Sequence, residues 1–84
     1  MSKKEKLIQK LLLAKTFKFS ELVSLLKMLG YTEVQGDGSR VKFDNGKPED
    51  LINLHKPHPG NEMKAYVVKQ VKEKLQRGGL IWNF

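Results

Sequence analysis

This 84-residue chain contains no cysteine, so it can form neither a disulfide bond nor a zinc site with thiolate ligands. It also lacks a long apolar run. Gln9 and Lys10 interrupt the apolar residues that follow the basic start, which argues against a signal peptide, and no segment approaches the roughly 20 apolar residues of a membrane span. Most of the seven aromatic residues are needed for a core. We therefore expect one small globular domain in the cytoplasm, without membrane association.

Positive charge is abundant and unevenly placed. The chain carries 16 basic and 9 acidic residues, a net charge of +7. Residues 1–18 carry a net +5 and residues 64–77 a net +4, whereas residues 19–63 carry a net −2. If the two basic segments are helices beside one sheet, their lysines would form a phosphate-facing surface for a nucleic acid. The alternative is a solvated surface that keeps the protein soluble.

Apolar periodicity predicts three helices. Residues 2–5 have the form of a capping box, and an apolar stripe follows over residues 7–12. The strongest pattern covers residues 22–29, which Ser20 can cap and Gly30 can end in a left-handed conformation. A last helix would start at a cap and carry a buried stripe before a Gly-Gly end, after which the chain folds back onto the core. Its residues are Asn61 for the cap, Val68, Val71 and Leu75 for the stripe, Gly78-Gly79 for the end, and residues 80–82 for the return.

Between the second and third helices the apolar period changes to two, which predicts three strands at residues 31–35, 39–44 and 50–55. Residues 16–18 and 36–38 are predicted to be a connection and a tight turn. The expected fold class is α+β, with a three-stranded antiparallel sheet and helices on one face in the order α-β-β-β-α. This is the architecture of double-stranded-RNA-binding domains. One extra helix precedes it, so residues 1–18 are expected to be an N-terminal helical extension and residues 19–84 the domain itself.

The segment from Leu54 to Gly60 concentrates the chemistry of the chain. It places His55, Lys56 and His58 among Pro57 and Pro59, directly after a predicted strand that prolines cannot continue. Imidazoles and an ammonium group on a stiffened segment can meet an anion. A metal site built from Asp50, His55, His58 and Glu62 would lack a recognised ligand spacing, so we expect no metal.

From residue 19 to residue 80, the order of these features resembles the HicA toxins of bacterial type II toxin–antitoxin systems. The features are the helix at 20–29 ending at Gly30, Gly38-Ser39, the Val-x-Phe strand at 41–43, His55-Lys56-Pro57-His58-Pro59, and the helix ending Gly79-Leu80-Ile81. The resemblance is to a branch with an N-terminal helical extension. It implies a basic mRNA interferase with a double-stranded-RNA-binding-like fold and no cofactor. It also implies two partners, an RNA and a HicB-type antitoxin that covers the active surface.

One position departs from the family pattern. Many members carry a histidine directly after the Gly-Ser pair or one residue later, and that imidazole is held responsible for RNA cleavage. Here Arg40 and Val41 follow Gly38-Ser39. Nuclease activity therefore cannot simply be transferred from the family to this chain.

His55 is the alternative source of an imidazole. If Ile52 and Leu54 face the helices, alternation places His55 on the open face of the sheet beside Arg40 and Lys42. A slip of one residue would bury His55 instead. Attack by an RNA 2′-hydroxyl needs a base, an acid and positive charge near the phosphate, and a histidine can change protonation near neutral pH. The competing interpretation is a polar residue that merely ends a strand.

Two hypotheses follow. In the first, the chain is a metal-independent endoribonuclease toxin with His55 as the catalytic acid/base. In the second, it is a non-catalytic RNA-binding module of the same fold, because the usual histidine is missing. The predicted RNA contacts are Ser39, through its hydroxyl group, with Arg40, Lys42, Lys56, His58 and Lys64.

Overall fold

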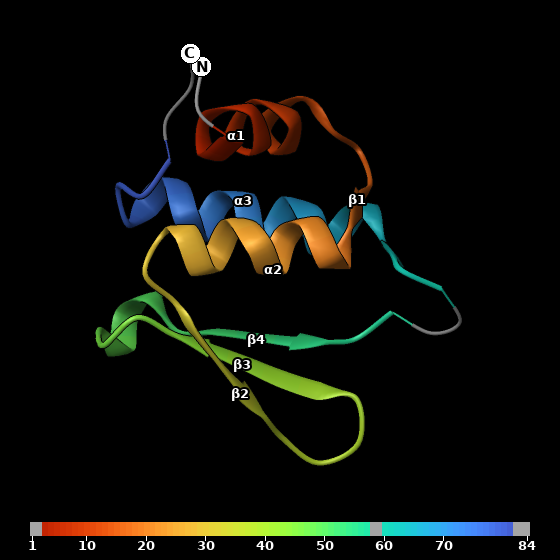
Figure 1. The fold of residues 1–84 in the computed structure, drawn as a ribbon, viewed down its shortest axis with the longest axis vertical. Helices are drawn as coiled ribbons and strands as arrows, with labels where there is room; N and C mark the ends of the chain where they lie inside the picture. The colour runs from red at the N-terminus through yellow and green to blue at the C-terminus, as the bar shows by residue number, and fades with distance from the viewer. Residues whose placement is uncertain (1–2, 58–59, 82–84) are drawn as a thin grey trace.

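A computed structural model describes residues 3–57 and 60–81 and confirms the predicted α+β fold class (Figure 1). Three antiparallel strands form a sheet in the order β2-β3-β4, with helices α2 and α3 on one face and α1 beyond these helices. The elements are α1 (Lys3–Leu13), β1 (Phe17–Lys18), α2 (Phe19–Met28), β2 (Thr32–Gln35), β3 (Arg40–Asp44), η1 (Pro48–Asp50), β4 (Ile52–His55), β5 (Glu62–Met63) and α3 (Ala65–Arg77).

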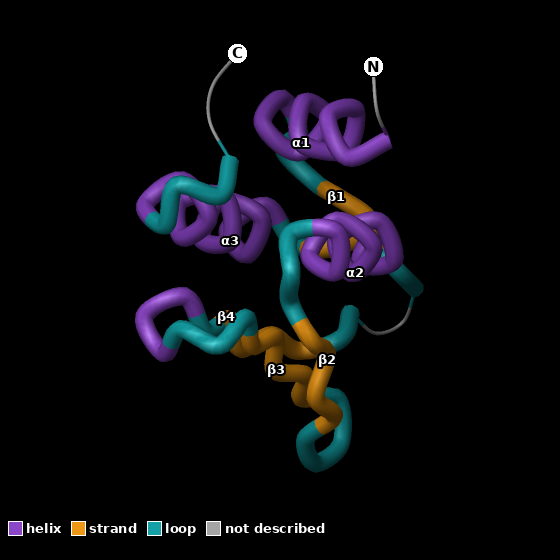
Figure 2. The backbone as a smooth tube through the Cα atoms, turned by 60° about the vertical axis from the view of Figure 1, so that its left-hand side comes forward, coloured by secondary structure: helices purple, strands orange, loops and turns teal. Residues whose placement is uncertain are grey.

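The core lies between the sheet and the helices. Alternate residues of β3 and β4 are buried, and each faces a buried partner across the ladder: Val41 pairs with Leu54, and Phe43 with Ile52. On the helices the predicted stripes are buried, including Leu22, Leu25 and Leu26 of α2 and Val68, Val71 and Leu75 of α3. The apolar face of the sheet and the apolar faces of the helices thus pack together in one layer. The other face of the sheet is not covered by any of the described helices (Figure 2).

The first helix packs on the domain. Leu7, Ile8 and Leu11 are buried in the same cluster as the α2 and α3 stripes. Lys72 of α3 also donates hydrogen bonds from Nζ to the backbone oxygens of Leu12 and Ala14, at 3.1 and 3.3 Å. A lysine is a suitable partner for the carbonyls at the end of a helix, which have no partner within the helix.

Two of the predicted helix caps, Ser20 for the second helix and Asn61 for the last one, are wrong. Helix α2 starts at Phe19, one residue before Ser20, and its first amides are bound by Asn61 from the distant segment. The backbone oxygen of Asn61 accepts from Phe19 N at 2.6 Å, and its Oδ1 accepts from Ser20 N at 3.1 Å. Asn61 therefore caps α2, while α3 starts later, after Lys64. The capping residue Ser2 predicted for the first helix lies outside the described residues.

The connection predicted at residues 16–18 contains a strand. Phe17 and Lys18 form β1, which pairs with β5 through Phe17 with Met63 and Lys18 with Glu62. This small ladder lies beside the start of α2 and fixes the segment that leads into α3. Thr16 extends it, since its hydroxyl donates to the carboxylate of Glu62 at 2.7 Å.

The third strand of the sheet is shorter than predicted. It begins at Ile52 because Pro48–Asp50 form a 3-10 turn, in which Asp50 is buried and accepts a hydrogen bond from Asn45 Nδ2. The Tyr31 hydroxyl donates to the backbone oxygen of Asp50 at 2.8 Å. Burial, with a smaller contribution from the negative charge of Asp50, raises the pKa of Tyr31 to about 12.

The predicted end of α2 and the predicted return of the chain to the core after α3 are confirmed for the described residues. Gly30 follows α2 with a φ of +97°, the left-handed conformation expected there. Ile81 returns to the core after α3 and is 2% exposed, whereas Trp82 lies outside the described residues. Within residues 3–57 and 60–81, none of the helices has the length and apolar character needed to cross a bilayer.

Candidate nucleic-acid interface

The open face of the sheet, opposite α2 and α3, carries the side chains that alternate with the core residues. Arg40 lies directly across the ladder from His55, and Lys42 lies across from Asn53. All four residues are exposed, whereas their neighbours Val41 and Leu54 are buried. The strand alternation therefore places His55, Arg40 and Lys42 together on one surface, in the register expected from the sequence.

The pairing geometry brings the Arg40 and His55 side chains close. Lys56 N donates to Ser39 O at 2.8 Å, so Ser39 and Lys56 form a hydrogen-bonded pair. In an antiparallel ladder the next pair is a non-hydrogen-bonded one, in which the Cα atoms approach to about 4.5 Å. Arg40 and His55 are that next pair. A permanent cation therefore stands beside the imidazole.

Ser39 also lies beside this imidazole. Its Oγ is 3.4 Å from Nδ1 of His55, and the tautomer of the ring decides which of the two groups donates. The second ring nitrogen, Nε2, is the one left for a ligand. Ser39 was predicted as a phosphate contact, and its position beside Nδ1 gives it an additional way to act, through the orientation of His55.

Two hollows meet at His55. The arginine hollow is lined by Arg40, Lys42 and His55 together with Val34, Gln35, Gly36, Asp37, Val41, Asn53 and Leu54. The tyrosine hollow is lined by His55, Lys56, Lys64 and Tyr66 together with Asn53, Leu54, Pro57, Glu62, Met63, Val67 and Gln70. They share Asn53, Leu54 and His55. The imidazole therefore lies at the junction of two surfaces, each of which contributes two cations.

The predicted RNA-contact residues thus lie close to His55, except for one that is outside the described residues. Arg40 and Lys42 lie in one hollow and Lys56 and Lys64 in the other, with Ser39 against His55. His58 lies outside the described residues. Within the part of the chain that the structure describes, no three histidine or acidic side chains come together in a way that could hold a metal ion.

The family model for the HicA toxin of bacterial toxin–antitoxin systems matches residues 19–77, from the first residue of α2 to the last residue of α3. The chain belongs to the HicA toxin family. The matched region contains the whole sheet, both helices that cover it, and every predicted contact residue. Helix α1 and strand β1 precede it. No curated protein and no solved structure matches the chain.

The lysines of α1 do not join the candidate site on the open face of the sheet. We expected the basic residues of both chain ends to converge near the sheet, but α1 lies beyond α2 and α3, on the side away from the sheet (Figure 1). For the lysines of Lys3–Leu13 the prediction is therefore wrong. The physical reason is that α1 buries Leu7, Ile8 and Leu11 against the outer side of the helix layer. The polar side of α1 therefore faces solvent on the side of the molecule away from the sheet.

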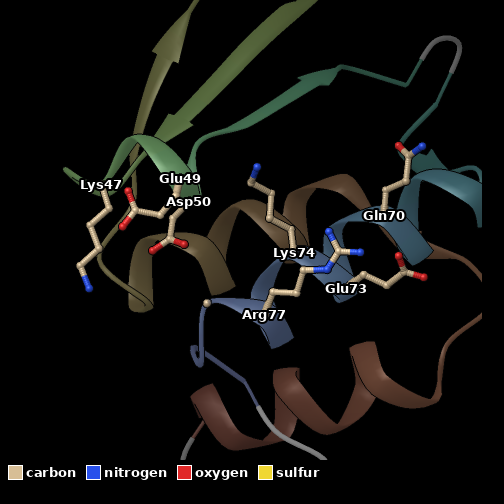
Figure 3. A pocket seen from close by; sticks show the side chains of 8 residues that line it. Lys47, Glu49, Asp50, Gln70, Glu73, Lys74 and Arg77 are labelled. Atoms are coloured by element: carbon tan, nitrogen blue, oxygen red, sulfur yellow. The ribbon is translucent and has the colours of Figure 1, made fainter.

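A third hollow lies between η1 and α3 (Figure 3). It is lined by Lys47, Lys74 and Arg77 and by Glu49, Asp50 and Glu73, together with Gln70 and Gly78. Three positive and three negative side chains give it no net charge. Such a surface attracts phosphate less than the two hollows at His55. No sequence pattern pointed to it, and we assign it no role in the candidate site.

The sequence predicts no RNA contact for Tyr66. Its side chain is 61% exposed and lines the tyrosine hollow, whereas Tyr31 is buried. One feature of the sequence indicates that Tyr66 is the exposed tyrosine. Tyr66 lies outside the stripe formed by Val68, Val71 and Leu75, so the helical period leaves it on the surface of α3.

Proposed function

We propose that this HicA-family chain is a metal-independent endoribonuclease that cleaves mRNA, with His55 as the catalytic acid/base. The observation that carries the proposal is the position of His55 at the junction of the arginine and tyrosine hollows. An RNA strand that crosses this junction would have cations on both sides of the phosphate next to the imidazole. Arg40 and Lys42 hold it on one side, and Lys56 and Lys64 on the other.

The reaction needs one bond to form as another breaks. The 2′-oxygen of a nucleotide attacks the adjacent phosphorus, and the bond from phosphorus to the 5′-oxygen of the next nucleotide breaks. Nε2 of His55 accepts the 2′-hydroxyl proton, because Nδ1 faces Ser39, and solvent protonates the departing 5′-oxygen. Arg40 stabilises the added negative charge on the phosphate oxygens, since it lies opposite His55 in the ladder.

The open face is also the surface that we propose for the HicB-type antitoxin. A protein that covers the sheet would exclude RNA from His55 without displacing a helix, because α2 and α3 lie on the other face. The toxin and antitoxin would meet in the cytoplasm, where mRNA is available.

Cleavage of a long mRNA in EDTA tests the proposal. We expect the unaltered chain to cut and His55→Ala to cut at least about 100-fold more slowly. His58→Ala removes the other imidazole, which is predicted only as an RNA contact, so at saturating RNA it should keep its cleavage rate. Circular dichroism and thermal unfolding check that the variants fold. Equal cleavage by all three chains would remove His55 from the mechanism.

A second function is favoured by Arg40 and Val41, which stand where many family members have their histidine. A chain that has lost its chemistry would bind RNA through the same cations without cutting it. It would show RNA affinity that falls steeply with salt, no cleavage products, and no growth arrest when expressed. Cleavage products that depend on His55 exclude this alternative.

A further inference from the structure

Tyr66 is the exposed aromatic residue of the described ranges. The other aromatic side chains in those ranges, Phe17, Phe19, Tyr31 and Phe43, are between 0 and 7% exposed, whereas Tyr66 is 61% exposed. It is the second residue of α3, and it lies beside the buried stripe of that helix rather than within it. Packing of the core therefore does not account for this side chain.

The surroundings of Tyr66 combine an aromatic ring with positive charge. Lys56, Lys64 and His55 line the same hollow. The acidic residue among the lining side chains is Glu62, whose carboxylate accepts a hydrogen bond from Thr16 at 2.7 Å. Proteins that bind single strands pair a positively charged groove for the phosphates with aromatic side chains on which bases stack. The tyrosine hollow has both parts.

We propose that Tyr66 stacks on one unpaired base of the RNA next to the phosphate at His55, so that the site takes single-stranded RNA. This inference rests on the proposed function, because it uses the same site. Lys56 and Lys64 hold the phosphates that flank this base. A base within a duplex is already stacked on both faces, so it cannot lie on a tyrosine ring unless the duplex opens.

Binding of single-stranded RNA would distinguish this chain from most domains of its architecture. Double-stranded-RNA-binding domains recognise the shape of a paired helix through its backbone and minor groove. A hollow with an exposed ring next to the imidazole selects instead for a base that is free to turn toward the protein. The sheet and helices would therefore support a different RNA structure from the one that the fold suggests.

A binding experiment with the full chain tests this. The experiment uses the His55→Ala background, in which cleavage should be at least about 100-fold slower. The probe is a 12-nucleotide RNA with 2-aminopurine at one internal position, used alone and paired with its complement. The unpaired strand should bind more tightly than the duplex and quench the probe fluorescence. Adding Tyr66→Ala should weaken binding of the unpaired strand roughly tenfold and abolish the quenching. Tyr66→Phe should restore both, whereas Tyr66→Leu should restore neither.

Leu13→Ala is the control for a large exposed side chain, since Leu13 is 88% exposed on α1 and lies outside both hollows. It should change neither affinity nor quenching. The inference is overturned if Tyr66→Ala binds the unpaired strand as tightly as its parent, or if the duplex binds equally well with the same dependence on Tyr66. Failure of the two proposals is distinguishable. If the unaltered chain does not cut RNA but binding still depends on Tyr66, only the proposed nuclease activity is refuted.

Discussion

The hydroxyl oxygen of Ser39 lies 3.4 Å from Nδ1 of His55, although the two residues are 16 positions apart in the sequence. The ladder holds them there, because Lys56 N, next to His55, donates to Ser39 O at 2.8 Å. Ser39 precedes β3 directly, where the tight turn ends. The Gly-Ser pair of the family pattern and the histidine at the end of β4 therefore lie side by side.

Removal of the Ser39 hydroxyl should slow cleavage without weakening RNA binding. Ser39→Ala leaves the imidazole free to turn, so we expect kcat to fall about 2- to 10-fold with KM unchanged. Ser39→Thr, which keeps a hydroxyl, should retain most of the activity. Steady-state kinetics on a short RNA would separate this role from a phosphate contact, for which KM would rise instead.

Lys64 should contribute to the salt dependence of RNA binding, and a lysine of α1 should not. In the His55→Ala background, Lys64→Ala should lower the slope of log affinity against log salt by about 0.7 for a single strand, as expected for one lost phosphate contact. Lys6→Ala is the matched control, because Lys6 is exposed on α1 beyond the helix layer. Filter binding at several salt concentrations measures both slopes. The assignment is wrong if the two variants change the slope equally.

Lys72 should stabilise the packing of the extension. Lys72→Met keeps an unbranched side chain but removes the bonds to the Leu12 and Ala14 carbonyls, so the free energy of unfolding should fall by about 1 kcal/mol. Urea denaturation measures the change. Lys69→Met, an exposed position of the same helix, should leave the midpoint nearly unchanged. Equal midpoints for both variants would show that these bonds add no stability.

The Tyr31 phenol should make stability fall at high pH. Its pKa is raised to about 12 in the folded chain, above the usual value of 10, so the unfolded chain loses this proton first. The stabilisation is complete below pH 10 and is lost as the pH rises toward 12. At pH 8, Tyr31→Phe should cost about 1 kcal/mol through the lost bond to Asp50 O. At pH 11 the difference should be smaller, and urea denaturation at both values would reveal a constant difference if the interpretation is wrong.

The sequence predicted the parts of this fold that carry a regular apolar period. Val41 and Phe43 alternate with Arg40 and Lys42, and burying the first pair fixes the face on which the second pair lies. The burial of Ile52 and Leu54 likewise fixes His55 on the open face. The stripes of α2 and α3 were equally readable, because each covers more than two helical turns.

Long-range pairings of short segments could not be predicted in this way. A two-residue strand such as Phe17–Lys18 has no period, so the sequence predicts only a connection there. Asn61 has the properties of a helix cap, but local sequence does not say which helix it caps, and it binds the start of α2 across 41 positions. The position of α1 was open for a similar reason, since an apolar stripe does not specify the layer on which it packs.

The small ladder between β1 and β5 connects the N-terminal segment to the side of the molecule that we propose for RNA binding. The family match begins at residue 19, yet Phe17 and Lys18 brace Met63 and Glu62, which directly precede Lys64. A chain trimmed to the matched region would lose the pairing of β1 with β5. Glu62 and Met63, which line the tyrosine hollow, would then be held less firmly. Removal of residues 1–18 should thus loosen the candidate site without altering any of the side chains that we propose as RNA contacts.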